Sequence, residues 1–369
     1  MEESKGKIGL REFVAIIFLT VGPKYGDDSP TILYKYLDTA AWMAPIIISI
    51  LSIIPIYFMI KVLGNYEEKN LSDVIRRLFG KYIGFIILMI LWIILICALT
   101  FDTAIYSNII TTMYFSETPL IAVYVVLMAV CAYGAKKGLQ QIGSVSWAVL
   151  FWIKLSLLSV LIIILFRGEF SFLFPIFGPG PLEVVKDSSM RLTLYAEFLY
   201  LGLIYPYLSS KRHFKKAIWI TLPLITVEIT IAIIGFILLF DYVGVKMMNY
   251  PFHEAIRYLE LGFLINIETF FFPFWLIATF VRFTFYLYLA SLLFGDLFKI
   301  KHFEYLTPIL ATLVFFLGLI PESPTFTIFY LREKLLTYVS PLFFLLPIII
   351  WILAVVRGEF KNDKTKNFH

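Results

Sequence analysis

Six ionisable side chains interrupt apolar stretches that are long enough to cross a membrane. They are Asp102, Lys154, Glu197, Glu228, Glu268 and Arg282. A charge at the centre of a bilayer costs a few kcal/mol, so each of these side chains is expected to face protein or water. Such groups bind ions or polar ligands, relay protons, or form structural ion pairs. Glu268 and Arg282 are fourteen residues apart on one predicted helix, about 21 Å along its axis, so they cannot pair with each other. Arg282 is expected to meet an acid on another helix near the cytoplasmic side. Glu228 has no evident partner, and the roles of these three residues stay open.

The motifs of enzymes and metal centres are absent from the sequence. Four histidines are scattered over predicted loops and the tail, at positions 213, 253, 302 and 369, and they form no ligand set. The chain contains no Gly-rich phosphate loop, no HExxH and no GxSxG motif. We therefore expect neither catalysis, nor a metal ion, nor a cofactor.

Composition places these charges in a multi-pass membrane protein. The chain of 369 residues is 60% hydrophobic and 15% charged, whereas soluble domains carry about a quarter charged residues. The net charge of +5 then reflects the orientation of the loops and does not indicate a nucleic-acid partner.

The first apolar helix stops too early to cross a bilayer. Its apolar run from Phe13 to Gly22 spans only about 15 Å at the helical rise, half of a hydrocarbon core of roughly 30 Å. Gly22 and Pro23 then oppose a continued helix, and Asp28 or Ser29 is expected to cap a new one. Backbone groups freed at membrane depth need protein or a water-filled cavity as a partner.

A similar interruption occurs halfway along the chain, at residues 190–208. There Gly202 and Pro206 punctuate an apolar helix. Paired broken helices at matching places in two halves indicate a transporter substrate site. The alternative is that both are ordinary kinks, since Gly and Pro are common in membrane helices.

Apolar runs of spanning length predict ten transmembrane helices. They cover residues 10–35, 41–63, 82–113, 118–134, 144–166, 190–209, 216–240, 262–294, 304–320 and 338–356, the first and sixth being broken. Alternate loops carry most of the Lys and Arg residues, which predicts that both termini are cytoplasmic. In this count Arg332 is a charge of an outside loop. A division near residue 170 leaves five helices in each half, so the halves must have opposite orientations in the membrane.

This division predicts two repeats and a tail. The first repeat covers residues 1–170 and includes an amphipathic cytoplasmic helix at 65–80, capped by Ser72 or Asn70. The second covers residues 171–357. The polar segment 358–369 is predicted to be a disordered cytoplasmic tail.

Four stretches carry a resemblance to a known family. They are LSDVIRRLFGKYIG (71–84), FPIFGPGPLEVVKDS (174–188), AEFLYLGLIYPYLSSKRHFKKA (196–217) and INIETFFFPFWLIATFVRFTFYLYLAS (265–291). With them the chain resembles the B subunits of spore germinant receptors, the germination permeases of the amino acid–polyamine–organocation superfamily. The resemblance implies an all-α, LeuT-like fold of five plus five helices in inverted repeats. It also implies sensing of a small germinant beside A and C subunits in the spore inner membrane.

The candidate ligand-binding residues flank both breaks and one face of the third helix. They are Thr20, Val21, Gly22, Pro23, Asp102, Tyr106, Tyr195, Glu197, Tyr200 and Gly202. Asp102 and Tyr106 are four residues apart and share a helix face. We expect Glu197 to face the ligand, where it would bind an ammonium group or pair with a nearby cation.

The first break departs from the pattern of the superfamily, in which a Gly-rich, uncharged turn binds a carboxylate through backbone N–H groups. Here Pro23 removes one donor and Lys24, Asp27 and Asp28 bring charge. Either Lys24 contacts an anionic group or these charges lie in an outer vestibule, and we favour the vestibule for Asp27 and Asp28.

In proton-coupled relatives a fifth-helix lysine takes the place of a sodium ion between the first and eighth helices. Lys154 matches it by helix and depth, so we expect Lys154 to act as a cation substitute that holds the carbonyl groups of the first break.

Three functions are compatible with these features. The first is a transporter-fold receptor that binds a nutrient, such as an amino acid, near the bilayer centre and signals through its partner subunits. The second is a proton-coupled permease for an amino acid or amine. The third is a water or ion conduit that a partner opens.

Overall fold

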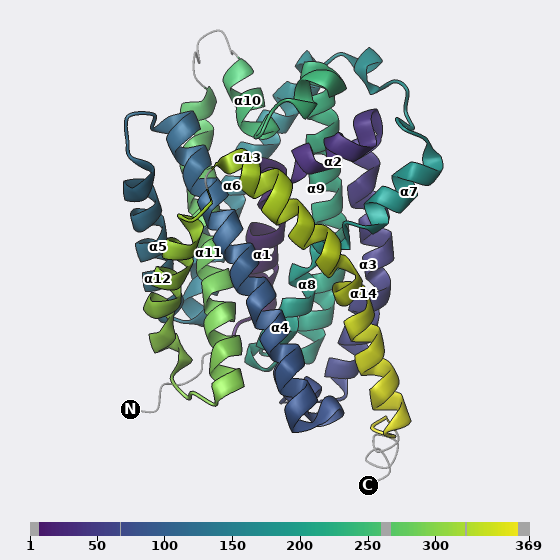
Figure 1. The fold of residues 1–369 in the computed structure, drawn as a ribbon, viewed down its shortest axis with the longest axis vertical. Helices are drawn as coiled ribbons and strands as arrows, with labels where there is room; N and C mark the ends of the chain where they lie inside the picture. The colour runs from purple at the N-terminus through teal and green to yellow at the C-terminus, as the bar shows by residue number, and fades with distance from the viewer. Residues whose placement is uncertain (1–6, 67, 260–266, 322, 361–369) are drawn as a thin grey trace.

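The structure is a computed structural model and describes residues 7–66, 68–259, 267–321 and 323–360. These residues form a bundle of helices, with one isolated parallel bridge between Ile8 and Leu208 (Figure 1). The α-helices are α1 (Leu10–Val21), α2 (Ser29–Leu37), α3 (Ala44–Gly64), α4 (Leu71–Ile109), α5 (Leu120–Lys136), α6 (Leu139–Arg167), α7 (Pro181–Ser189), α8 (Glu197–Tyr200), α9 (Lys211–Lys246), α10 (Pro251–Tyr258), α11 (Ile267–Phe298), α12 (Thr307–Gly318), α13 (Pro324–Phe326) and α14 (Glu333–Val356).

Long apolar helices make up most of the bundle. Within the described residues, six helical segments are long and apolar enough to cross a membrane, and α5 and the segment Phe303–Gly318 are shorter apolar helices. Together with the two interrupted segments around α1 and α8, these helices lie where the sequence predicts ten spans. Residues 262–266 of the eighth predicted span and residues 361–369 of the predicted tail lie outside the described residues. The described chain begins and ends at the same end of the bundle (Figure 1).

The first break lies where the sequence predicts it. α1 ends at Val21, a 3-10 turn follows over Gly22–Gly26, and α2 begins at Ser29 with Pro30 in its first turn. Gly22 itself has right-handed helical angles, φ −56° and ψ −49°. The break therefore results from Pro23 and from the extended backbone at Asp27, which has φ −107° and ψ −160°.

The second interruption is spread over a longer segment than the sequence suggests. Residues Leu192–Tyr195 and Leu201–Tyr207 are 3-10 helices, and only the four residues of α8 between them are α-helical. Gly202 and Pro206 lie in the second 3-10 stretch. Such tight turns leave backbone carbonyl groups available to other partners. The carbonyl of Leu194, for example, accepts a hydrogen bond from the side chain of Lys24.

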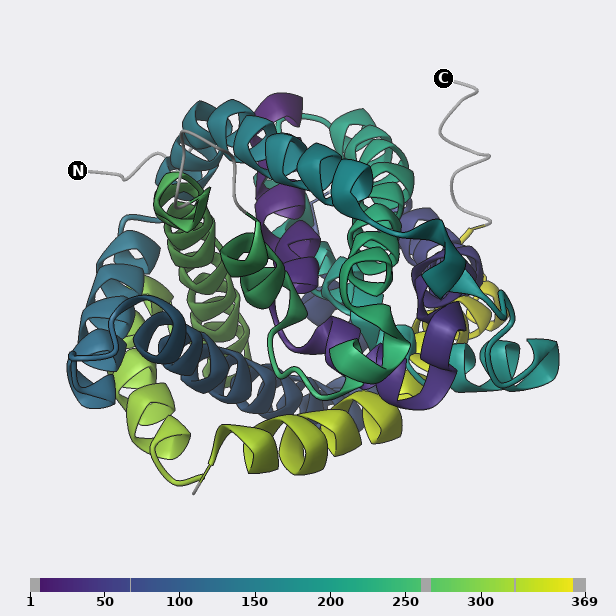
Figure 2. The ribbon, with the colours of Figure 1, turned by 90° about the horizontal axis from the view of Figure 1, so that it is seen from above.

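α1 lies inside the bundle, packed against α6, α9 and α11, and the view from above shows longer helices on several sides of it (Figure 2). Its side chains Phe13, Ile16 and Ile17 are fully buried. Because an interrupted helix exposes backbone groups, this central place supplies protein partners for them.

The structure changes the starts of two predicted segments. The amphipathic segment predicted at 65–80 is helical only from Leu71, and it ends at Gly80 as predicted, where φ 81° and ψ 178° separate it from the long remainder of α4. Its cap is Asn70, one of the two predicted residues, which forms a capping box with Asp73. The last span begins well before residue 338, because a π-helical stretch, Thr327–Arg332, leads directly into α14.

Candidate functional site

Seven charged side chains gather where the two interrupted helices meet, and we call them the charge cluster. They are Lys24, Asp27, Asp28, Asp102, Glu197, Arg282 and Arg332. They come from the first break, α4, α8, α11 and the start of the last span. Arg282 and both neighbouring aspartates of the break are completely buried. Their mutual pairing compensates the cost of removing these charges from water.

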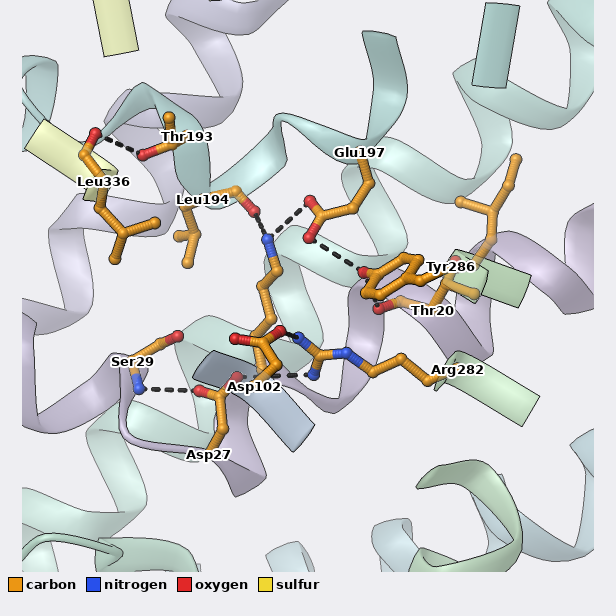
Figure 3. Close-up of polar contacts among 12 residues, drawn as sticks. Thr20, Asp27, Ser29, Asp102, Thr193, Leu194, Glu197, Arg282, Tyr286 and Leu336 are labelled. Carbon is orange, nitrogen blue, oxygen red and sulfur yellow. Dashed lines mark hydrogen bonds and ion pairs between the residues drawn. The ribbon is translucent and has the colours of Figure 1, made fainter. Parts of the chain in front are cut away.

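Lys24 joins the two interrupted helices. Its Nζ donates to Glu197 Oε2 at 2.6 Å and to the carbonyl oxygen of Leu194. The Tyr286 hydroxyl lies 3.0 Å from Glu197 Oε1 and 3.0 Å from the carbonyl oxygen of Thr20 (Figure 3). The first break, α8 and α11 are thus held by one hydrogen-bonded group.

Arg282, halfway along α11, pairs with carboxylates of two other elements. Its Nη2 donates to Asp102 Oδ2 at 2.8 Å, and its Nη1 lies 3.4 Å from Asp27 Oδ2 (Figure 3). Nη1 also donates to the Tyr106 hydroxyl at 2.7 Å. Asp102 and Tyr106 therefore do share a face of α4, and that face meets Arg282.

Arg332 contacts the same region from the last span. Its Nη2 donates to Asp27 Oδ2 at 2.9 Å, its Nε lies 3.2 Å from Asp102 Oδ1, and its Nη1 forms an ion pair with Asp28. The backbone N–H of Ser29 donates to the other oxygen of Asp27 at 2.7 Å. Asp27 thus sits between two guanidinium groups and the first turn of α2.

A cavity opens beside the charge cluster. It has about 690 Å³ of empty space, including the part that opens outward, and its polar end is formed by Lys24, Asp102, Glu197, Tyr286 and Arg332. The remaining walls are mostly apolar and come from α4, the segment around α8, α11 and α14: Ile94, Leu95, Ala98, Thr193, Ala196, Tyr200, Leu289, Leu335, Leu336, Val339 and Phe343. An apolar pocket with a few convergent polar groups is the usual form of a small-molecule site.

The candidate residues of the first break lie beside the cavity rather than in its wall. Thr20 contributes its carbonyl oxygen to Tyr286, and the Pro23 carbonyl accepts a long, 3.5 Å hydrogen bond from Tyr106. Val21 is buried in the core. Gly22 faces the other way, since a Cβ at this position would lie 3.2 Å from Lys154 Nζ.

Of the candidate residues at the second interruption, two line the cavity and two lie outside its lining. Glu197 and Tyr200 line the cavity, and the Tyr200 hydroxyl donates to the Leu91 carbonyl at 2.9 Å. Tyr195 points away and lies 3.0 Å from Thr226 through its hydroxyl. Gly202 packs against α3 and the start of α4, where a Cβ would lie 3.2 Å from both Leu63 and Leu71.

Lys154 pairs with Glu228, for which the sequence offers no partner. Nζ lies 2.5 and 2.6 Å from the two carboxylate oxygens and is next to Gly22 at the first break. Among the described residues, this ammonium group donates its hydrogen bonds to the carboxylate of Glu228 and not to the carbonyl groups of the break. Its role as a substitute for a cation stays a prediction.

Three interpretations of charges need correction. Asp27 and Asp28 are not in a vestibule but are fully buried. Arg332, counted in the sequence as a loop charge, is 5% exposed and belongs to the charge cluster. Arg282 meets acids on other elements, as expected, but at the first break and not near the cytoplasmic end. Among the described residues, Glu268 lies 3.8 Å from Arg257, whereas Arg282 pairs with Asp27 and Asp102.

A buried histidine also contacts the first break, which the sequence did not indicate. His253 Nε2 lies 2.9 Å from the Gly26 carbonyl oxygen, and Nδ1 lies 2.7 Å from the Tyr114 hydroxyl. Because a carbonyl only accepts, Nε2 carries the proton and Nδ1 accepts from Tyr114. Burial lowers the pKa of His253 to about 4, so the ring is neutral at pH 7.

Within the part of the chain that the structure describes, no three His, Cys, Asp or Glu side chains are arranged to hold a metal ion. The carboxylates of the charge cluster are instead directed at arginine and lysine. What the cluster offers is a polar, paired surface at one end of an apolar cavity.

Comparison with known proteins agrees with this architecture. The chain is 22% identical over 325 residues to spore germination protein YndE of Bacillus subtilis (strain 168), covering 86% of this chain and 88% of that protein. It is 21% identical over 326 residues to spore germination protein B2 of the same organism, covering 87% and 88%. It is 25% identical over 252 residues to spore germination protein XB of Bacillus anthracis, covering 68% and 70%.

Among solved structures, the chain is similar to Mhp1, a nucleobase-cation-symport-1 family transporter, in a closed conformation with bromovinylhydantoin bound. The TM-score is 0.61 at 12% identity, covering 88% of this chain and 75% of the transporter. This likeness shows that the fold is of the LeuT-like transporter type predicted from the sequence. The sequence profile of the spore germination protein family matches residues 26–327, and the chain therefore belongs to that family of membrane proteins.

Proposed function

We propose that this protein is the nutrient-sensing B subunit of a spore germinant receptor and that it binds a small molecule in the cavity beside the charge cluster. The observation that carries the proposal is the meeting of both interrupted helices at that cavity, through the contact between Lys24 and Glu197. Broken helices at the repeat interface are where transporters of this fold class hold their substrates.

The same proposal includes a cellular setting. The protein would lie in the spore inner membrane with both termini in the cytoplasm, beside A and C subunits that receive the signal. Family membership and the transporter-like fold support this setting. The proposal assigns no catalytic step to the chain.

A receptor of this kind is expected to be stabilised by its germinant. The test is a thermal-shift screen of the purified protein in detergent with amino acids, amines, sugars and nucleosides. A ligand present at a hundred times its Kd stabilises the folded state by about 2.7 kcal/mol. At least one class should therefore raise the melting temperature measurably. If no compound does so at millimolar concentration, the proposal is contradicted.

A second candidate function is coupled transport, which the likeness to a solved transporter favours. The two functions are separated by uptake of a labelled hit from the screen into proteoliposomes that contain this subunit alone. Robust uptake driven by a proton gradient would favour a permease. Binding without uptake would favour a receptor that needs its partners.

A further inference from the structure

The anion site at the first break is already filled by the protein itself. The N-terminus of a helix attracts a negative group through its free N–H groups and its dipole. At the start of the nine-residue helix α2, Asp27 Oδ1 accepts the Ser29 N–H at 2.7 Å. The other oxygen lies 2.9 Å from Arg332 Nη2 and 3.4 Å from Arg282 Nη1. A ligand carboxylate would have to displace this tethered one.

The cations that line the cavity have few free hydrogen-bond donors for an anionic ligand. Arg332 directs all three of its guanidinium nitrogens at protein oxygens, on Asp27, Asp28, Asp102 and Ser29. The Lys24 ammonium has three N–H donors and uses two, on Glu197 and the Leu194 carbonyl. A carboxylate entering the cavity would find one uncommitted donor on Lys24 and the Nη1 group of Arg332, which is ion-paired with Asp28 but makes no hydrogen bond to a described residue.

The carboxylates keep free acceptor capacity. Each can accept about four hydrogen bonds. Glu197, which lines the cavity, accepts from Lys24 on one oxygen, and its other oxygen lies 3.0 Å from the Tyr286 hydroxyl, whose single proton also faces the Thr20 carbonyl. Asp102 also lines the cavity and faces Arg282 and Arg332. Within the charge cluster three cations face four carboxylates, so the cluster carries an excess of one negative charge when all seven groups are ionised.

From this arrangement we infer that the cavity selects a ligand with a protonated amine and without a carboxylate, its ammonium group placed against Glu197 and Asp102. This inference rests on the proposed function, because it names the chemical class bound at the same site. The remaining walls of the cavity indicate the chemical character of the rest of the ligand. Leu289, Leu336, Val339 and Phe343 are apolar, so an aliphatic or aromatic group is expected to fill the rest of the cavity.

The test uses three compounds with the same branched hydrocarbon group: 3-methylbutylamine, L-leucine and 3-methylbutanoate. Their binding to the purified full-length protein in detergent is measured by isothermal titration calorimetry at pH 7. The amine is expected to bind at least tenfold more tightly than L-leucine, and 3-methylbutanoate is expected to bind more weakly than both. Equal or tighter binding of L-leucine or of 3-methylbutanoate would overturn the inference while leaving a small-molecule site in place.

Absence of amine binding would also overturn the inference. The proposed function would then be decided separately by the wider screen, which includes sugars and nucleosides. In a second arm, Glu197→Gln is expected to weaken amine binding at least tenfold. The matched control Glu183→Gln, on the exposed side of α7, is expected to leave it unchanged. Equal affinities of the two variants for the amine would remove Glu197 from the site and contradict the assignment.

Discussion

Lys24 Nζ lies 2.6 Å from Glu197 Oε2, and this contact joins two interrupted helices whose residues are 173 positions apart in the chain. Lys24 is buried, and the Glu197 side chain is only 17% exposed. The contact therefore links the first break to α8 in surroundings where an unpaired charge is costly. It also forms the polar end of the cavity, so structure and proposed ligand recognition depend on the same pair.

Removing Lys24 should destabilise the protein strongly. Lys24→Met leaves the largely buried carboxylate of Glu197 with Tyr286 as its remaining partner, and breaking a buried pair costs about 3–5 kcal/mol. The double variant Lys24→Met with Glu197→Leu should recover most of this loss. As a control, Lys35→Met removes the half-exposed pair with Glu333 and should cost at most about 1 kcal/mol. Melting temperatures in detergent test this order of stability, and a double variant that melts below Lys24→Met would contradict it.

Ligand binding should not require sodium. The ammonium group of Lys154 already faces both oxygens of Glu228 next to Gly22, so a cation occupies the place beside the first break. We expect the Kd of a screened ligand to agree within a factor of two in sodium chloride and in potassium chloride at equal ionic strength. Tightening of tenfold or more by sodium would show that Lys154 does not replace the ion.

Alanine should be tolerated at Gly22, although the sequence marks this glycine as part of the break. Its backbone is right-handed helical, and a Cβ would meet only the ends of Lys154 and Glu228, at 3.2 and 3.3 Å. The stability of Gly22→Ala should stay within about 1 kcal/mol of the wild type.

Gly178→Ala provides the contrast. Its φ is +46° and its Cβ would lie 2.5 Å from the Leu37 carbonyl oxygen, so it should lose more than about 1 kcal/mol. Melting temperatures of the two variants in detergent test both statements. A larger loss at Gly22 than at Gly178 would be the opposite of what the backbone geometry predicts.

Stability should fall in mild acid because of His253. The pKa of this residue is lowered from 6.5 to about 4 by burial, so the unfolded chain binds more protons than the folded one between these values. The stabilisation is complete above about pH 6.5 and is lost as the pH falls toward 4, by roughly 3 kcal/mol in all. Melting temperatures between pH 4 and 7.5 should fall less steeply for His253→Gln than for the wild type. The exposed control His302→Gln should keep the wild-type slope.

The position of the first break could be predicted from the sequence because its causes are local. Pro23 cannot continue the hydrogen bonding of a helix, and the next helix begins within the few residues that follow. The cap at Asn70 and the common face of Asp102 and Tyr106 are local in the same sense. Each depends on residues at most four positions apart.

The partners of the charges could not be predicted in this way. Asp27 is paired with Arg332 across 305 positions, and a sequence pattern does not distinguish a loop arginine from a buried one at a helix start. Asp27 and Asp28 follow a Gly-Pro turn, which favours a solvated loop, and only tertiary packing places two guanidinium groups beside them. The partner of Glu228 could not be predicted for the same reason, because Lys154 lies on a different helix.

The central claim is that the cavity beside the charge cluster is where the ligand binds. Its most direct test is the Kd, measured by titration calorimetry, of the compound that stabilises the wild type most. The variant Ala98→Phe fills the cavity from α4, and Ala104→Phe adds the same group on α4 outside the cavity lining. With both variants melting near the wild-type temperature, Ala98→Phe should bind at least tenfold more weakly and Ala104→Phe as tightly as the wild type. Unchanged binding by Ala98→Phe would contradict the account.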